Sequence, residues 1–194
     1  APRKANHPSG CHAVAAANVD QLLIVFAPQP EPEPELLDRY LVAAHVLGLR
    51  PVLLMNKADL PAAQCAQAEN VLAEYTALGY PCLRISGRTN LGLDALRDHM
   101  AGMASLLVGQ SGVGKSALTN ALVPGALSRV GELSEALGTG RHTTTTTRWH
   151  PLPGGGALLD APGVRDFKLW PLSPHELLQG FPEFAGLAPC RFAN

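Results

Sequence analysis

Short runs of apolar residues alternate with segments of helical periodicity along the first two thirds of the chain. The runs are apolar at nearly every position, which is typical of parallel strands that are buried on both faces of a sheet. Between them, apolar residues recur with the spacing of one helix face. The alternation predicts an α/β fold with a parallel sheet. The expected strands are residues 21–27, 52–55, 80–85 and 104–108, and the expected helices are residues 36–47, residues 62–78, a helix beginning at Asn90, and residues 117–122.

Three other segments lack a helical pattern. Residues 28–34 carry a proline at every second position, which removes backbone donors and favours an extended loop. A ligand for a proline-recognition domain is the alternative interpretation. Residues 125–148 hold few core-forming side chains and end in a run of threonines, which is typical of a functional or mobile segment. Residues 148–152 and 156–160 predict a β-hairpin.

The composition narrows the class of protein. Of the 194 residues, 46% are apolar and 16% are charged, which is enough for one main globular domain. No apolar run approaches the roughly 18 residues of a membrane helix, and no charged-then-apolar leader opens the chain, so we expect no membrane partner. The four cysteines lack zinc or disulfide spacing, which predicts reduced cytoplasmic thiols. A formal net charge of −1 means that an RNA partner would need a local basic patch or a missing domain.

The segment Gly109-Gln-Ser-Gly-Val-Gly-Lys-Ser116 has the spacing G-x-x-x-x-G-K-[ST] of a phosphate-binding loop, between an expected strand and an expected helix. Its glycines let backbone N–H groups reach a phosphate, Lys115 supplies positive charge, and Ser116 offers a hydroxyl to Mg²⁺. A strand-to-helix turn without a ligand is the alternative. The candidate phosphate-binding residues are Gly109, Gln110, Ser111, Gly112, Val113, Gly114, Lys115, Ser116 and Ala117.

A second group of candidates follows two other expected strands, where ligands of open α/β sheets bind. Guanine presents N1–H and an exocyclic amino group on one edge, and the carboxylate of Asp59 has two acceptor oxygens for them. Adenine offers no such pair of donors, so a buried carboxylate here would select guanine. The candidate base-binding residues are Asn56, Lys57, Ala58, Asp59, Ser86 and Gly87.

Each of these residues has an expected role and an ordinary structural alternative. We expect Asn56 to tie its loop to neighbouring segments and Lys57 to lie along the plane of the base. Small residues at Ser86-Gly87 would let backbone N–H groups approach the guanine carbonyl. Alternatively, Asp59 could cap a helix that has Pro61 in its first turn, and Ser86-Gly87 could be a plain turn.

Candidate switch residues come after the phosphate loop. A threonine whose hydroxyl and carbonyl meet Mg²⁺ and the γ-phosphate is what a switch segment needs, and Thr143 and Thr144 are equally good candidates. The threonine run could instead be an edge strand. Asp160 can bind Mg²⁺ through water, and the N–H of Gly163 can reach the γ-phosphate. An aspartate before Pro-Gly is common in plain turns, but a phosphate loop upstream favours the metal role.

The GTPase motifs are present in an unusual order, because the base-recognition residues precede the phosphate loop. This order predicts a circularly permuted P-loop NTPase domain with three α/β/α layers, which is feasible because domain termini often lie close together. The sequence resembles the RsgA/YjeQ family of small-ribosomal-subunit biogenesis GTPases over nearly its whole length. Gly87 and Ala161 depart from the usual family residues, and we expect both changes to be harmless. The segments that carry the resemblance are residues 18–26, 109–116, 140–145 and 160–167.

The resemblance implies domain boundaries. Family members carry an N-terminal OB-fold barrel and a C-terminal zinc-binding domain. Residues 1–12 are therefore expected to be a linker remnant after a missing barrel, residues 13–170 the permuted GTPase domain, and residues 171–194 the start of an incomplete helical and zinc-binding domain. Cys190 matches the first zinc ligand of the family, but a structural zinc site needs about four ligands, so we expect no zinc in this chain.

The resemblance also implies a function. The chain is expected to hydrolyse GTP to GDP and phosphate, with Mg²⁺, as a switch in late maturation of the small (30S) ribosomal subunit. It would contact that subunit and its rRNA largely through missing flanking domains, as a cytoplasmic monomer. Val164 stands where many GTPases have a water-positioning glutamine, and the resemblance points to His142 as the catalytic residue, with an ordinary surface histidine as the alternative. A nucleotide-binding structural module in which hydrolysis is incidental is the competing function, and Asp59 argues against an ATPase.

Overall fold

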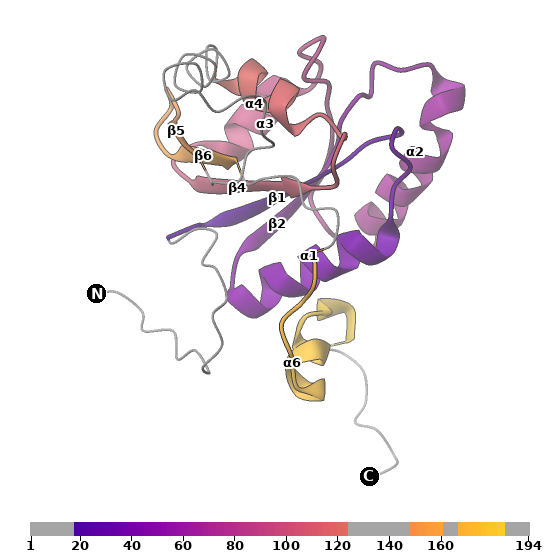
Figure 1. Cartoon of the computed structure of the whole chain (residues 1–194), viewed down its shortest axis with the longest axis vertical. Helices are drawn as coiled ribbons and strands as arrows, with labels where there is room; N and C mark the ends of the chain where they lie inside the picture. Colours follow the sequence, from indigo (N-terminus) through magenta and orange to yellow (C-terminus); the bar gives the residue numbers. More distant parts are fainter. Residues whose placement is uncertain (1–17, 124–147, 161–166, 185–194) are drawn as a thin grey trace, which may run out of the picture.

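The computed structural model describes residues 18–123, 148–160 and 167–184. Within these ranges, six strands form one sheet in the order β3-β2-β1-β4-β6-β5 (Figure 1). All neighbouring strands are parallel except β5, which is antiparallel to β6. The strands are β1 Gln21–Phe26, β2 Arg50–Met55, β3 Cys82–Arg84, β4 Ala104–Gly109, β5 Arg148–Pro151 and β6 Ala157–Asp160.

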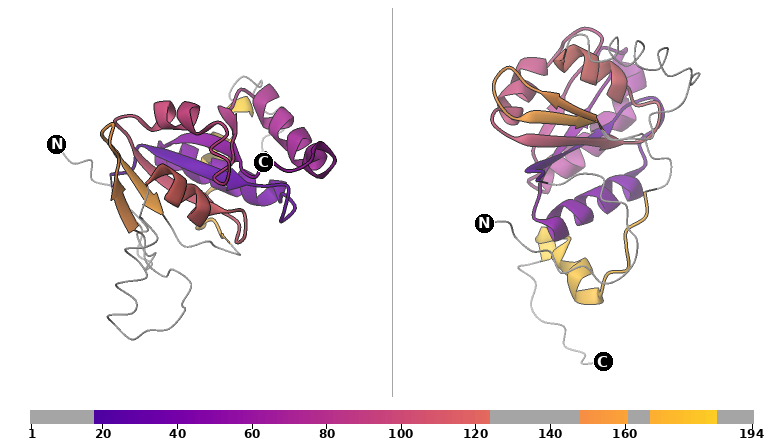
Figure 2. Two further views of the ribbon diagram at one scale, coloured as in Figure 1. Left: turned by 90° about the horizontal axis from the view of Figure 1, so that it is seen from above. Right: turned by 60° about the vertical axis from the view of Figure 1, so that its left-hand side comes forward.

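Helices cover both faces of this sheet, which gives the predicted three-layer α/β/α arrangement. Figure 1 shows α3 and α4 above the sheet and α1 below it. Two further helical segments, α6 and η1, lie beyond α1 (Figure 2). The helices are α1 Pro34–Leu47, α2 Ala62–Ala77, α3 Leu93–Met100, α4 Lys115–Leu122, α6 Pro174–Gln179 and the 3₁₀ helix η1 Pro182–Phe184. None of the helices in the described ranges is both long and apolar enough to cross a membrane.

The apolar run of β1 is explained by its position, because it pairs with β2 on one side and β4 on the other. Every residue of β1 is buried. Alternate side chains enter different cores: Ile24 and Phe26 pack with α1 and α2, whereas Leu23 and Val25 pack with α3 and α4. A parallel strand covered on both faces needs apolar residues at consecutive positions, which is the pattern seen here.

Polar side chains form hydrogen bonds at the seam between β1 and β4, which is where the first residues of these two paired strands meet in an otherwise apolar core. The side-chain Nε2 of Gln21 donates to Ser105 Oγ at 2.7 Å and to the His99 carbonyl at 3.1 Å. Gln21 is 1% exposed and Ser105 is fully buried. Beside them, Ala104 N donates to Asp20 Oδ2 at 2.8 Å, and Asp20 N donates to the Ala104 carbonyl at 2.9 Å. These bonds join segments 84 residues apart in sequence.

Most predicted elements are present, with shifted ends. The helix expected to begin at Asn90 begins at Leu93 instead. Asn90 and Gly92 have φ of 63° and 68°, outside the helical region, and Ser86 N donates to the Leu91 carbonyl at 2.9 Å, which closes this stretch into a loop. Strand β3 is also shorter than the predicted residues 80–85. The hairpin of β5 and β6 is confirmed.

The pattern of apolar residues did not predict α6, which begins with a capping box. Ser173 Oγ accepts from Glu176 N at 3.3 Å, and Ser173 N donates to Glu176 Oε2 at 2.8 Å. The segment packs on α1, where a side chain at Gly180 would lie only 2.7 Å from a methyl group of Val42. The expected boundary at residue 171 stays a prediction, and residues 185–194 lie outside the described ranges.

We predict that Gln21→Ala lowers the free energy of unfolding by about 2–4 kcal/mol, because it leaves the buried Ser105 hydroxyl without its partner and opens a void. Urea denaturation measures this change. Gln64→Ala, at an exposed position of α2, is the matched control and should shift stability by less than about 0.5 kcal/mol. In a double-mutant cycle with Ser105→Ala the two effects should be coupled, and strict additivity would contradict the prediction.

Candidate functional site

The candidate site lies at the carboxyl ends of the parallel strands. The chain runs outward from β1 to β2 and β3, then returns to β4 on the opposite side of β1. Ligands of open α/β sheets bind at such a reversal point. The predicted phosphate loop follows β4, residues 56–59 follow β2, and Ser86 follows β3 with one residue between. The fold therefore brings three segments that are distant in sequence to one edge of the sheet.

Two glycines shape the phosphate loop, residues 109–116. Gly109 ends β4 with a φ of 144°, and a side chain there would collide with the Val25 carbonyl of the neighbouring strand. Gly114 has a φ of 93° and directly precedes α4, and a Cβ at this position would lie 2.5 Å from Asn56 Nδ2. Both positions combine close approach of another segment with a backbone conformation that favours glycine. The loop delivers the chain to the amino terminus of α4, where backbone N–H groups favour an anion.

Lys115 is the buried positive charge of this loop. Its Nζ donates to the Gly109 carbonyl at 2.7 Å and to the Gln110 carbonyl at 2.9 Å. Burial lowers the pKa of the Lys115 ammonium, and the negative charge of Asp160 opposes that shift. Because desolvation penalises the charged form, an anion at the loop would stabilise the ammonium. The side chain is thus positioned to compensate a negative ligand.

The side-chain amide of Asn56 joins the three segments. Nδ2 donates to the Val113 carbonyl in the phosphate loop at 2.8 Å, and Oδ1 accepts from the backbone N–H of Gly87 at 3.1 Å. Asn56 is 2% exposed, and both of these bonds are formed without water. The amide therefore fixes the separation between the phosphate loop and the loop after β3.

Lys57 bridges the phosphate loop and the proline-rich segment. Its φ of 61° is unusual for a residue other than glycine. The ammonium donates to the Gln29 carbonyl at 2.5 Å and to the Gly112 carbonyl at 2.8 Å. Its neighbour Ala58 donates from its backbone N–H to the Ile85 carbonyl at 3.0 Å, which attaches the 56–59 loop to the end of β3.

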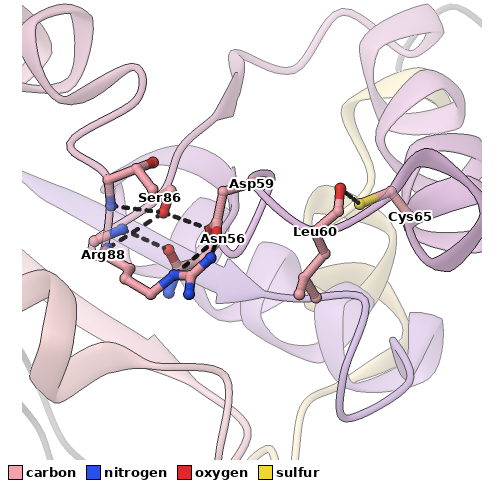
Figure 3. A network of polar contacts seen from close by, with 8 residues as sticks. Asn56, Asp59, Leu60, Cys65, Ser86 and Arg88 are labelled. Atoms are coloured by element: carbon pink, nitrogen blue, oxygen red, sulfur yellow. Dashed lines mark hydrogen bonds and ion pairs between the residues drawn. The ribbon is translucent and has the colours of Figure 1, made fainter.

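Both carboxylate oxygens of Asp59 accept hydrogen bonds from the loop after β3 (Figure 3). Ser86 Oγ donates to Oδ1 at 2.6 Å, and Arg88 donates to Oδ2 from Nε at 2.9 Å and from Nη2 at 2.5 Å. These bonds, Ser86 first and Arg88 second, hold the pKa of Asp59 below its ordinary value. The alternative role as a helix cap is wrong, because the N-cap of α2 is Pro61 and no side chain caps it.

Gly87 and Ser86 are closely packed. The Ser86 hydroxyl also accepts from the backbone N–H groups of Arg88 at 3.2 Å and Thr89 at 3.1 Å, so the loop turns around this side chain. A Cβ at Gly87 would lie 2.9 Å from the backbone nitrogen of Leu118 in α4. Glycine at this position therefore lets the loop after β3 approach α4.

Two predicted metal ligands lie on neighbouring elements. Ser116 is exposed in the first turn of α4, and Asp160 is the last residue of β6, paired in register with Leu107 of β4. Hydroxyl and carboxylate oxygens are the hard ligands that Mg²⁺ prefers. Across residues 18–123, 148–160 and 167–184 there is no group of three His, Cys, Asp or Glu side chains that could hold a metal ion alone.

Several predicted residues lie outside the described ranges. They are His142, Thr143, Thr144, Ala161, Gly163, Val164 and Cys190. The chain is described again from Phe167, whose ring stacks on Tyr40 of α1 with centroids 4.6 Å apart. Arg39 Nη1 donates to the Phe167 carbonyl at 3.3 Å. The segment that follows the predicted switch residue Gly163 is thus attached to α1.

Sequence reasoning missed two contributions to the site. The proline-rich segment touches the phosphate loop directly: Glu33 accepts from the side chain of Gln110, and the Pro30 ring lies beside Gly112. This contact could have been predicted from the position of the segment: it directly follows β1, and β4, the neighbour of β1, leads into the phosphate loop. Arg88 was not singled out either, although it follows Ser86-Gly87 at the same edge of the sheet.

Comparison with known proteins places these motifs in a family. A family model described as RsgA GTPase matches residues 3–170. The small ribosomal subunit biogenesis GTPase RsgA of Ectopseudomonas mendocina (strain ymp) is 53% identical over 181 residues, covering 92% of this chain and 53% of that protein. The protein of the same name from Azotobacter vinelandii (strain DJ / ATCC BAA-1303) is 52% identical with the same coverage. The chain thus spans about half the length of the curated relatives it matches.

Solved structures agree with the fold and the order of its motifs. YjeQ from Thermotoga maritima is similar with a TM-score of 0.72 and 31% identity, over 91% of this chain and 59% of that one. YloQ, described as a circularly permuted GTPase, is similar with a TM-score of 0.66 and 26% identity, over 90% and 55% of the two chains. The chain, with its base-side residues ahead of its phosphate loop, belongs to the RsgA GTPase family.

Proposed function

We propose that this chain binds GTP with Mg²⁺ and hydrolyses it to GDP and phosphate, as a switch in late maturation of the small (30S) ribosomal subunit. The observation that carries the proposal is the bridge made by Asn56. This buried amide is bonded to both the phosphate loop and the loop after β3, so one side chain sets the spacing between the two ends of a nucleotide site. Family membership supports the same ligand.

In this proposal Asp59 recognises the guanine base. Its carboxylate is ionised at neutral pH, as an ordinary aspartate is, so it can accept the N1–H and the exocyclic amino group together. The backbone around Ser86 and Gly87 approaches the guanine carbonyl, while Lys57 and Ala58 lie along the base. A base without two adjacent donors would leave the carboxylate unpaired, which is the basis of selection.

The phosphate end uses the loop from Gly109 to Ala117. Lys115 would exchange its two carbonyl partners for phosphate oxygens, and the amino terminus of α4 adds backbone N–H groups. Mg²⁺, held by Ser116, Asp160 and one of Thr143 or Thr144, would supply charge neutralisation on the phosphates. The Gly163 N–H would meet the γ-phosphate. Val164 cannot orient water, so we assign that role to His142.

The partner in this proposal is the small ribosomal subunit with its rRNA, because the similar proteins are named for its biogenesis. The chain spans about half of their length, so we assign most of the ribosome contact to segments beyond this domain. A protein with this partner acts in the cytoplasm, where the subunits mature. We also propose that it acts as a monomer, because one chain supplies the residues of the site.

Asp59→Asn tests the base assignment. The amide removes the charge and one acceptor, so GTP affinity should fall about 10²–10⁴-fold, while xanthosine triphosphate, whose altered base edge suits an amide, should gain relative to GTP. Competition titration with both nucleotides measures the shift. Unchanged preference for GTP over xanthosine triphosphate would remove Asp59 from the base site.

His142→Ala tests the catalytic assignment and separates the two function classes. Nucleotide binding should be retained, whereas single-turnover hydrolysis with small subunits present should fall roughly 10²-fold or more. The unsubstituted protein should be stimulated by the subunits. Absence of stimulation would favour a structural module in which hydrolysis is incidental, and full stimulated turnover in the variant would reject His142.

A further inference from the structure

Arg88 presents to Asp59 the same kind of donor edge that guanine has. Its guanidinium donates to Oδ2 from two nitrogens on one side of a planar group, at 2.9 Å and 2.5 Å. Guanine likewise offers two N–H donors from adjacent nitrogens of a planar group. Each can satisfy a carboxylate through a two-point contact, which is why such pairs are geometrically specific.

The two ligands cannot share this edge of Asp59. Ser86 takes one acceptor position of Oδ1, whereas the guanidinium takes both acceptor positions of Oδ2, so Arg88 fills one of the two oxygens that a base would need. The Asp59 side chain is only 11% exposed, which leaves little room for approach from another direction. Guanine binding at this carboxylate would therefore require Arg88 to leave.

The burial of the two partners makes that exchange feasible. The Arg88 side chain is 77% exposed, so it reaches Asp59 from solvent and can return there without rearranging the core. Ser86 is fully buried and holds the loop after β3 through backbone bonds, so it stays in place. An exposed cation therefore lies beside a largely buried anion.

We infer that Arg88 competes with guanine for the carboxylate of Asp59 and so limits the affinity for guanine nucleotides. This inference rests on the proposed guanine site. While Arg88 pairs with Asp59, the carboxylate stays ionised and satisfied. A base can replace the guanidinium only if it offers the carboxylate an equivalent pair of N–H donors. Arg88 thus lowers the affinity for guanine nucleotides and leaves the affinity for nucleotides that do not use Asp59 unchanged.

Arg88→Ala removes the competitor. Exposed ion pairs are weak, so GDP should bind about two- to sixfold more tightly than in the unsubstituted chain, measured by fluorescence titration or calorimetry at low ionic strength. ADP, which does not use Asp59, should bind with unchanged weak affinity. Arg88→Lys keeps the charge but loses the planar fork, so its gain in GDP affinity should be smaller.

Arg84→Ala is the matched control. Arg84 lies in β3 at 61% side-chain exposure and pairs with Glu69 at 2.5 Å, so this variant also removes one exposed arginine from an ion pair. It should leave GDP affinity unchanged or slightly reduced. The gain in GDP affinity produced by Arg88→Ala should also become smaller as the salt concentration rises, because screening weakens the Arg88–Asp59 ion pair that competes with GDP.

The outcomes separate this inference from the proposed function. GDP binding that is selective over ADP but unaltered or weakened by Arg88→Ala would overturn competition by Arg88 and leave the guanine site intact. Tightening of GDP and ADP by the same factor would indicate a general charge effect and would also overturn it. Absence of GDP binding by the unsubstituted chain would reject the guanine site itself.

Discussion

The buried amide of Asn56 has no freedom to move without breaking a contact at one of its two ends. It binds the Val113 carbonyl and the Gly87 N–H, and a side chain at Gly114 would collide with it. In a dry environment each unmade bond would cost about 1–3 kcal/mol, so the two loops are held at a fixed spacing. The spacing between the phosphate loop and the loop after β3 therefore depends on one buried residue.

The charged residues of the site are arranged around this fixed spacing. Lys115 and Asp59 lie on the phosphate and base sides, and each is already satisfied by groups of the chain. In the proposed function, nucleotide binding is an exchange of partners at both ends, in which the carbonyls at Lys115 and the guanidinium of Arg88 would be replaced. The net gain at each end is then a difference between two bonded states and is smaller than the energy of either contact alone.

The sequence was sufficient to predict the parallel α/β fold, because strands such as β1 are apolar at nearly every position and helices such as α1 are periodic. The phosphate loop and residues 56–59 were also recognisable, since their chemistry is encoded in adjacent positions. Contacts between distant segments could not be recognised in the sequence. For this reason the pairing of Arg88 with Asp59 and the contact of Glu33 with Gln110 were missed. The late start of α3 depends on left-handed Asn90, which local propensity does not disclose.

The seam between β1 and β4 also affects how the chain folds during its synthesis. The polypeptide emerges from the ribosome amino end first, and domains fold as they become complete. Strand β1 can pair with β2 early, but its other edge stays open until β4 follows, with 84 residues separating Gln21 from Ser105. An unpaired central strand whose side chains are apolar except for Gln21 is prone to associate with other chains. The permuted order therefore places β1, β2 and β3 in a nascent chain that cannot pair both edges of β1 until β4, which leads into the phosphate loop, has been translated.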